Sequence, residues 1–313
     1  MDFTLTPEQE LVRDSARSLL TKECPPSLVR AHADDPGAAD PLWKHLREWT
    51  DLAGAPLVDL CLFLEETGAV LAPGPFFATT ALYAPLLRAV GVEAGAEVGT
   101  VALPDHPYVV EAERADVVAV VEPGPSGAEV RVIERPPARF VATIDSSRRL
   151  ASVDTGGPGA GVPVSGDALD VVLARAYVAL AAELIGTVRW LFDTTLAYAK
   201  ARVQFDRPIG SFQAVQHKLA NMALVKEQAW SAVYYAAMTI DAGDPDLHRA
   251  AHVAKVMAGE AAKLNAKDAI QIHGGIGYTW EHDLHLYIRR AYASEYLLGT
   301  SDWHRDRLAT LIL

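Results

Sequence analysis

Arg202 carries the side chain in this sequence that is best suited to binding a phosphate group. It lies at the end of a long stretch with apolar residues at helical spacing, and Phe205, Pro208 and Gly210 follow it. The planar guanidinium of arginine matches paired phosphate oxygens. An arginine at a helix C-terminus is also favourable without any ligand, because carbonyl dipoles accumulate there. The spacing alone leaves both interpretations open.

A glycine cluster forms the second candidate. Gly274, Gly275 and Gly277 follow an apolar helix that is predicted to end at Ile272. Glycine permits positive φ and a close approach of the backbone to a ligand, but it is also the usual residue just beyond a helix C-terminus. The cluster is therefore either a ligand-binding segment or a helix end.

The remaining reactive side chains show no catalytic arrangement. His273 and His282 have no acidic residue at a spacing that would suggest a catalytic pair, so we interpret them as structural. Cys24 and Cys61 lie far apart, without a CxxC pair or a nearby histidine cluster. This predicts buried thiols in a reducing cytoplasm, neither a disulfide nor a zinc site. No metal is expected.

Length and charge restrict the kinds of partner. The 313 residues, 50% of them hydrophobic, suffice for two or three compact units. The 28 basic and 40 acidic residues give a net charge of −12, with no long basic run. Neither a nucleic acid nor a membrane is therefore an expected partner. The N-terminus lacks a signal pattern and no apolar run is judged long enough to span a membrane, which predicts a cytoplasmic protein.

Residues 1–95 are predicted to form an all-helical domain. Thr6 with Gln9 forms a capping box around Pro7. Residues 31–41 are predicted to be a loop, and Asp40 is predicted to cap the next helix. Further helices are predicted from Pro56 to Gly68 and over 76–90.

Residues 96–160 are predicted to form a reduced β domain and a linker. The β-branched runs 117–121, 130–133 and 140–144 are separated by proline-containing turns, which suits a small antiparallel sheet. The glycine-rich stretch 156–159 is the predicted linker.

Residues 161–313 are predicted to form a bundle of long antiparallel helices over 169–204, 211–240, 247–272, 284–298 and 301–313. Ser211 is the predicted cap of the second of these helices, and Gly299-Thr300-Ser301 provides a helix stop and a cap for the last. The fold class is therefore α with a small β domain.

Taken together, the stretches 202–213 and 268–280 resemble the C-terminal bundle of the acyl-CoA dehydrogenases, and residues 1–95 resemble that family's N-terminal domain. The resemblance implies that FAD is the cofactor and that its ADP part is bound here while a neighbouring subunit holds most of it. The residues implied in this contact are Arg202, Gln204, Phe205, Gln213, Gln271, Gly274 and Gly275.

The catalytic base of the family has no counterpart in this sequence. Most members carry a glutamate directly before Gly-Thr, where this chain has Leu298, and others carry it at the position of Ala176. Glu295 and Glu183 are the nearest carboxylates, but they are offset by about one and two helical turns. No catalytic residue is therefore expected.

Other departures affect the cofactor site. Asp206 and Asp302 replace a glycine and a glutamine of the family, and a carboxylate beside a diphosphate is repelled. The β segment also lacks the family's two flavin-facing motifs, of Thr-Glu-Pro type and Trp-x-Thr/Ser type.

The resemblance is to the short, base-lacking subunit of actinobacterial α2β2 acyl-CoA dehydrogenases that act on steroid-type CoA thioesters. It implies a partner subunit that carries the glutamate and binds most of the acyl-CoA, with an electron-transfer flavoprotein as a further partner. Two alternatives stay open: a flavin-free scaffold, and an active homodimer with Glu295 as a displaced base.

Overall fold

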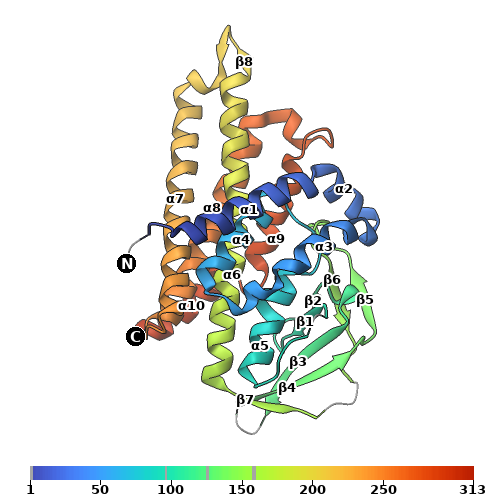
Figure 1. Ribbon diagram of the computed structural model, residues 1–313. Helices are drawn as coiled ribbons and strands as arrows, with labels where there is room; N and C mark the ends of the chain where they lie inside the picture. Colours follow the sequence, from blue (N-terminus) through green and yellow to red (C-terminus); the bar gives the residue numbers. More distant parts are fainter. Residues whose placement is uncertain (1–2, 96, 125–126, 157–159) are drawn as a thin grey trace.

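The computed structural model describes residues 3–95, 97–124, 127–156 and 160–313. One helix, α6 (Gly166–Ala201), runs through the whole length of the molecule (Figure 1). The other long helices lie beside it, the N-terminal helices cross in front of it, and the strands that precede it in sequence lie together at the lower right of the view. The predicted class, α with a small β domain, is confirmed. The boundaries 1–95, 96–160 and 161–313 stay a prediction.

The N-terminal part contains α1 (Pro7–Glu23), α2 (Pro26–Asp34), α3 (Asp40–Leu46), α4 (Leu57–Ala69) and α5 (Ala84–Ala89), joined by short 3₁₀ and π turns. The capping box is confirmed: the Thr6 amide donates to Gln9 Oε1 at 3.1 Å, and Thr6 Oγ1 accepts from the Gln9 amide. The predicted 31–41 loop is wrong, because α2 extends to Asp34 and a 3₁₀ turn follows over Pro36–Ala39. Asp40 lies inside the first turn of α3 and does not cap it.

The strands form two small sheets. The first has the order β1-β3-β4-β7 and contains β1 (Gly99–Ala102), β3 (Val117–Gly124), β4 (Gly127–Glu134) and β7 (Val162–Ser165). The second has the order β2-β6-β5 and contains β2 (Val109–Val110), β6 (Leu150–Val153) and β5 (Ala138–Val141). The prediction of a single antiparallel sheet is wrong in two respects: the strands form two sheets, and β1 pairs parallel with β3. Residues 157–159 of the predicted linker lie outside the described residues.

The bundle consists of α6, α7 (Gln213–Asp241), α8 (Leu247–His273), α9 (Leu284–Tyr296) and α10 (Ser301–Ile312). α6 ends at Ala201, three residues earlier than predicted, because Arg202 adopts an extended backbone. Ser211 does not cap α7: its hydroxyl donates to the Pro208 carbonyl at 2.7 Å. Thr300 does cap α10, since its hydroxyl accepts from the Trp303 amide at 3.1 Å.

α4 and α6 cross in backbone contact. A Cβ added at Gly68 would overlap the carbonyl of Glu183, and a Cβ added at Gly186 would overlap the carbonyl of Glu65. This close crossing buries the middle of α6. By length and composition α6 could cross a membrane, contrary to the expectation from sequence, but 83% of its apolar stretch is buried inside the protein. It is the central helix of the core.

Candidate functional site

The hairpin after α6 projects from the end of the bundle, at the top of Figure 1. It consists of β8 (Val203–Gln204) and β9 (Arg207–Pro208), which pair antiparallel. Phe205 and Asp206 between them have φ of 53° and 60°, a left-handed conformation that is unfavourable for phenylalanine. Phe205 is 86% exposed. A strained aromatic ring that is this exposed contributes little to the packing of the chain, and such strain is typical of binding sites.

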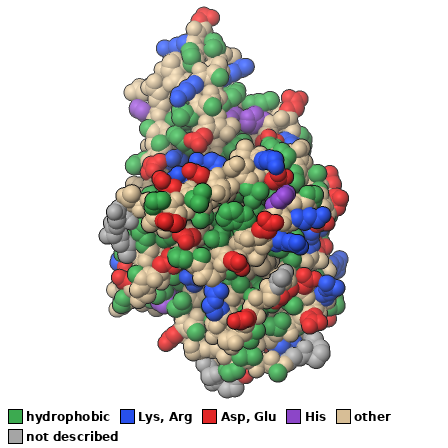
Figure 2. Space-filling model, viewed as in Figure 1, with side chains coloured by type: hydrophobic (Ala, Val, Ile, Leu, Met, Phe, Trp, Pro, Cys, Tyr) green, Lys and Arg blue, Asp and Glu red, His purple; other side chains and the backbone are tan. Residues whose placement is uncertain are grey.

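Cationic and aromatic groups share this tip. Arg202 is exposed and forms no ion pair within the part of the chain that the structure describes. The Arg207 guanidinium lies 4.1 Å from the centre of the Phe212 ring, and Phe205 meets the same ring edge-on at 6.1 Å. Figure 2 shows basic and hydrophobic side chains together on this projection. Arg207 was not identified from sequence, although it lies directly after the turn and close to Arg202. Gln204 and Gln213 are exposed on either side of the turn.

The glycine segment presents open backbone. α8 ends at His273, and Gly274 follows with φ 62° and ψ −140° in a 3₁₀ turn, Gly274–Tyr278. A Cβ added at Gly274 or Gly275 would meet no atom within 4 Å, so intrachain packing does not require glycine there. At Gly277 the space is tighter, because a Cβ would lie 3.0 Å from a Leu284 methyl group. The first two glycines thus leave backbone accessible to a ligand, and Gln271 is exposed one turn earlier on α8.

The helix ends that carry the hairpin and the glycine segment are in contact. Tyr198, four residues before Arg202, stacks on His273, the residue directly before Gly274, with ring centres 4.4 Å apart. An exposed guanidinium suits a diphosphate, an exposed aromatic ring suits stacking against a nucleobase, and open backbone suits close approach. The residues therefore fit the ADP part of FAD. The exposed carboxylate of Asp206 is the exception, since it lies beside the guanidinium in sequence.

Both positions where the family carries its base are buried and apolar. Ala176 is fully buried, and Leu298 is 3% exposed with φ 58°. Lys255 fills the space around the Leu298 turn: its ammonium donates to the carbonyls of Glu295 at 2.9 Å and Gly299 at 3.0 Å. Burial lowers the pKa of Lys255 to about 7. His304 Nε2 lies 3.1 Å from the Leu298 carbonyl and, as a donor, completes this packing.

Neither substitute carboxylate is free to act as a base. Oε1 of Glu295 accepts from the Ser301 amide at 2.9 Å and lies 3.4 Å from the Lys263 ammonium. Glu183 forms ion pairs with Arg148 and, at 3.4 Å, with Arg290. These contacts hold both side chains in structural roles. Asp302 is paired with Arg305 at 2.8 Å on the surface of α10.

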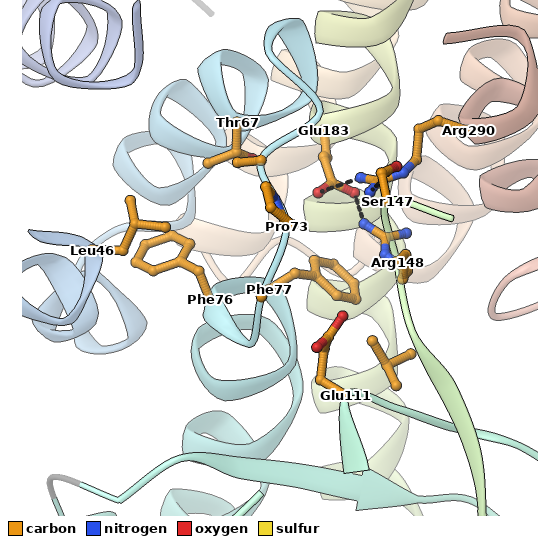
Figure 3. A pocket seen from close by; sticks show the side chains of 13 residues that line it. Leu46, Thr67, Pro73, Phe76, Phe77, Glu111, Ser147, Arg148, Glu183 and Arg290 are labelled. Carbon is orange, nitrogen blue, oxygen red and sulfur yellow. Dashed lines mark hydrogen bonds and ion pairs between the residues drawn. The ribbon is translucent and has the colours of Figure 1, made fainter. Parts of the chain in front are cut away.

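A buried ion cluster lies where the N-terminal helices, the strands and the bundle meet (Figure 3). It consists of Asp145, Ser147, Arg148, Glu183 and Arg290, and Figure 3 shows both arginines directed at Glu183. The Arg290 side chain also donates to Asp145 at 2.6 Å and to the Ser147 hydroxyl at 2.7 Å.

The cavity beside this cluster is small. It measures about 10 Å³, room for about one water molecule. Phe76, Phe77 and Glu111 line it together with the cluster, and burial raises the pKa of the Glu111 carboxyl. A cavity of this size does not admit an acyl chain. The two arginines were not singled out from sequence, although each stands in an Arg-Arg pair beside apolar residues.

Both cysteines are buried and free, and burial raises the pKa of the Cys24 thiol to about 12. Among the described residues, no group of three or more histidine, cysteine, aspartate or glutamate side chains could hold a metal ion.

Comparison with known proteins identifies the class. Residues 167–313 match the acyl-CoA dehydrogenase C-terminal domain. The chain is also 35% identical over 311 residues to a curated acyl-CoA dehydrogenase, with 93% of each chain covered. It therefore belongs to the acyl-CoA dehydrogenase family, whose cofactor is FAD. This confirms the resemblance; the roles of individual site residues stay predictions.

The curated relative is acyl-CoA dehydrogenase IpdE2 of Mycobacterium tuberculosis. Among solved structures, a Tcur3481–Tcur3483 steroid ACAD variant is 25% identical, with a TM-score of 0.81 and coverage of 99% of this chain and 98% of that chain. The ChsE4–ChsE5 complex from Mycobacterium tuberculosis has a TM-score of 0.86 at 22% identity, covering 100% of this chain and 99% of that chain. The last likeness concerns the fold alone.

Proposed function

We propose that this chain is the non-catalytic subunit of a heteromeric, FAD-dependent acyl-CoA dehydrogenase. One observation carries the proposal: the side chains proposed to bind ADP are exposed on a projecting tip, whereas both base positions are buried and apolar. A chain built in this way can complete a flavin site in another subunit but cannot remove a proton from an acyl-CoA. The partner supplies the glutamate and most of the acyl-CoA pocket.

The relatives support the finer parts of the proposal. One similar structure is described as a steroid ACAD and another as a complex of two named subunits. We therefore propose an α2β2 assembly that oxidises a bulky acyl-CoA of the steroid side-chain class in the cytoplasm and passes electrons to an electron-transfer flavoprotein. The contacts of Glu295 argue against the homodimer alternative, since its Oε1 already accepts from a backbone amide.

This chain's part in the reaction is to bind and orient the cofactor. FAD, when bound, supplies the acceptor for the hydride that leaves the β-carbon of the acyl group. Arg202 would hold the diphosphate, Phe205 would stack on the adenine, and Gly274 and Gly275 would let backbone approach the cofactor. Gln204, Gln213 and Gln271 would complete the polar contacts. The proton is removed by the partner's carboxylate.

Flavin content tests the proposal. The chain is purified alone and with a co-expressed base-bearing subunit, and flavin absorbance is measured after gel filtration. We expect a colourless chain alone and one FAD per two unlike chains in the complex. One FAD per chain when it is made alone would instead indicate a homodimer, and no FAD in either preparation would indicate a scaffold.

Arg202→Ala tests the half-site directly. Its charge-assisted bond to a diphosphate is worth on the order of 1.5–3 kcal/mol, or about tenfold to more than a hundredfold in FAD affinity. We expect the complex to assemble but to lose flavin on dialysis, and Arg202→Lys to restore only part, because an ammonium cannot reproduce the guanidinium geometry. Arg249→Ala, at an exposed arginine paired with Asp246, is the matched control. Full FAD retention by Arg202→Ala would refute the half-site.

A further inference from the structure

The Tyr198–His273 pair links the two segments of the candidate FAD site, and it was not among the predicted site residues. We infer that this pair is a positioning element: it fixes the hairpin that carries Arg202 relative to the Gly274–Gly275 backbone, so that one dinucleotide can contact both. The inference rests on the proposed function for its effect on FAD. Its effect on the order of the two segments is independent of that function.

On the α6 side, the backbone ties Tyr198 to Arg202. The Arg202 amide donates to the Tyr198 carbonyl at 2.8 Å, and the Ile209 amide donates to the Arg202 carbonyl at 2.8 Å. The first bond ends α6, and the second closes the base of the hairpin. The Tyr198 ring is therefore attached to the same backbone turn that sets the direction in which Arg202 leaves the helix.

On the α8 side, His273 is held in one orientation. It is 3% exposed, and its Nδ1 lies 2.8 Å from the Ala269 carbonyl, which can only accept, so Nδ1 carries the hydrogen. Burial lowers the pKa of His273, which keeps the ring neutral. A Cβ at Gly277 would lie 3.3 Å from the His273 Cβ, so the glycine turn also packs against this residue.

The stack joins these two anchored residues. The ring planes of Tyr198 and His273 are inclined by 21°, with centres 4.4 Å apart. The Tyr198 hydroxyl lies 3.4 Å from the His273 carbonyl, which is too long for a strong hydrogen bond, so ring contact is the main interaction. Without it, the hairpin and the glycine turn would each have to be ordered when FAD binds, and affinity falls when binding must order loose segments.

A hydrogen-exchange experiment on the chain alone tests the first part. We expect Tyr198→Leu to speed amide exchange over 202–212 and 274–279 while leaving the core helices unchanged. The matched control is Trp190→Leu, which removes a stack of the same kind between α6 and α9. The ring centres of Trp190 and Tyr287 lie 3.5 Å apart, and their ring planes are nearly parallel. The control should not loosen those two segments. If Tyr198→Leu does not fold, Tyr198→Met removes the ring while keeping most of the side-chain volume.

FAD affinity of the complex tests the second part. An aromatic pair contributes about 0.5–1.5 kcal/mol beyond its buried area, which corresponds to a roughly two- to tenfold loss of FAD affinity for Tyr198→Leu. Tyr198→Phe keeps the ring and should bind FAD normally. In the double variant with Arg202→Ala, FAD affinity should fall by less than the product of the two single-variant fold losses, because Tyr198 acts through the placement of Arg202.

The outcomes are distinct. Unchanged exchange over both segments, or a loss of FAD affinity that Trp190→Leu reproduces, would overturn the positioning role. Multiplicative losses in the double variant would also overturn it, since they would show that Tyr198 acts independently of Arg202. Full FAD retention by Arg202→Ala would instead overturn the proposed function and leave the exchange result to decide whether the pair orders the two segments.

Discussion

Replacing Glu183 with glutamine should destabilise the whole chain, because it removes one of the two anions that face Arg148 and Arg290. The substitution keeps the size of the side chain and removes only its charge. The side chains of Glu183, Arg148 and Arg290 are 4%, 8% and 1% exposed, so solvent screens their interaction little. Removing one member of a buried ion pair typically costs about 3–5 kcal/mol.

The position of Glu111 places the expected loss near the lower end, about 3 kcal/mol. Burial raises the pKa of this carboxyl, which lines the same cavity. An uncompensated positive charge nearby would favour its ionised form and offset part of the loss. The comparison variant Asp246→Asn breaks an exposed pair with Arg249, which should cost no more than about 1 kcal/mol.

The assay is equilibrium denaturation of the chain alone, followed by circular dichroism and by the fluorescence of its six tryptophans. The double variant Glu183→Gln with Arg148→Met restores the charge balance, so it should be more stable than the sum of the two single losses predicts. The reasoning is refuted if Glu183→Gln costs no more than Asp246→Asn, or if the two losses in the double variant simply add.

Three further predictions concern the tip and the Leu298 turn. Asp206→Asn in the complex should tighten FAD binding at low salt, and the gain should fade at high salt because salt screens the repulsion. Asparagine tolerates the same positive φ, so a gain seen only with Asp206→Gly would mean that backbone strain, not charge, is responsible. The pKa of Lys255 is lowered from 10.5 to about 7, so the unfolded state binds more protons than the folded state between these two pH values. Relative to Lys255→Met, the stability of the chain should therefore rise with pH across that window, by up to about 1.4 kcal/mol per pH unit. Denaturation midpoints measured from pH 7 to 10 check this, and an equal dependence of stability on pH in both proteins would contradict it. Leu298→Glu should not make the chain alone an active acyl-CoA dehydrogenase, since Lys255 and His304 fill the adjoining space. Turnover with an artificial electron acceptor at a rate comparable to that of an ordinary family member would refute this prediction.

The parts of the fold that depend on residues close to one another in sequence could be predicted from the sequence. The Thr6 capping box and the Thr300 cap are formed within three residues, and the long helices follow from local periodicity. α2 was missed because its start, Pro25-Pro26, offers no side-chain cap, and its last residues are small and acidic. The parallel pairing of β1 with β3 joins strands separated by β2, and periodicity gives no information on strand order.

The candidate site divides in the same way. Arg202 and the glycine segment could be identified because each forms a continuous stretch of sequence. The ion cluster could not, since Arg290 meets Glu183 from 107 residues away and Asp145 from 145 residues away. Glu183 was noticed from sequence, but as a candidate base, because only the structure shows that two arginines surround it.

The crossing of α4 and α6 at Gly68 and Gly186 affects how this chain can be divided. The predicted boundaries at 95 and 160 separate stretches of different composition. At the crossing, however, the backbone of α4 in the first stretch contacts the backbone of α6 in the third. A gene fragment that encodes only 161–313 would leave Gly186 facing water where α4 belongs, together with an apolar α6 surface of membrane-spanning length. Such a fragment is expected to aggregate or associate with lipid. The bundle and its N-terminal helices are therefore expected to fold as one unit.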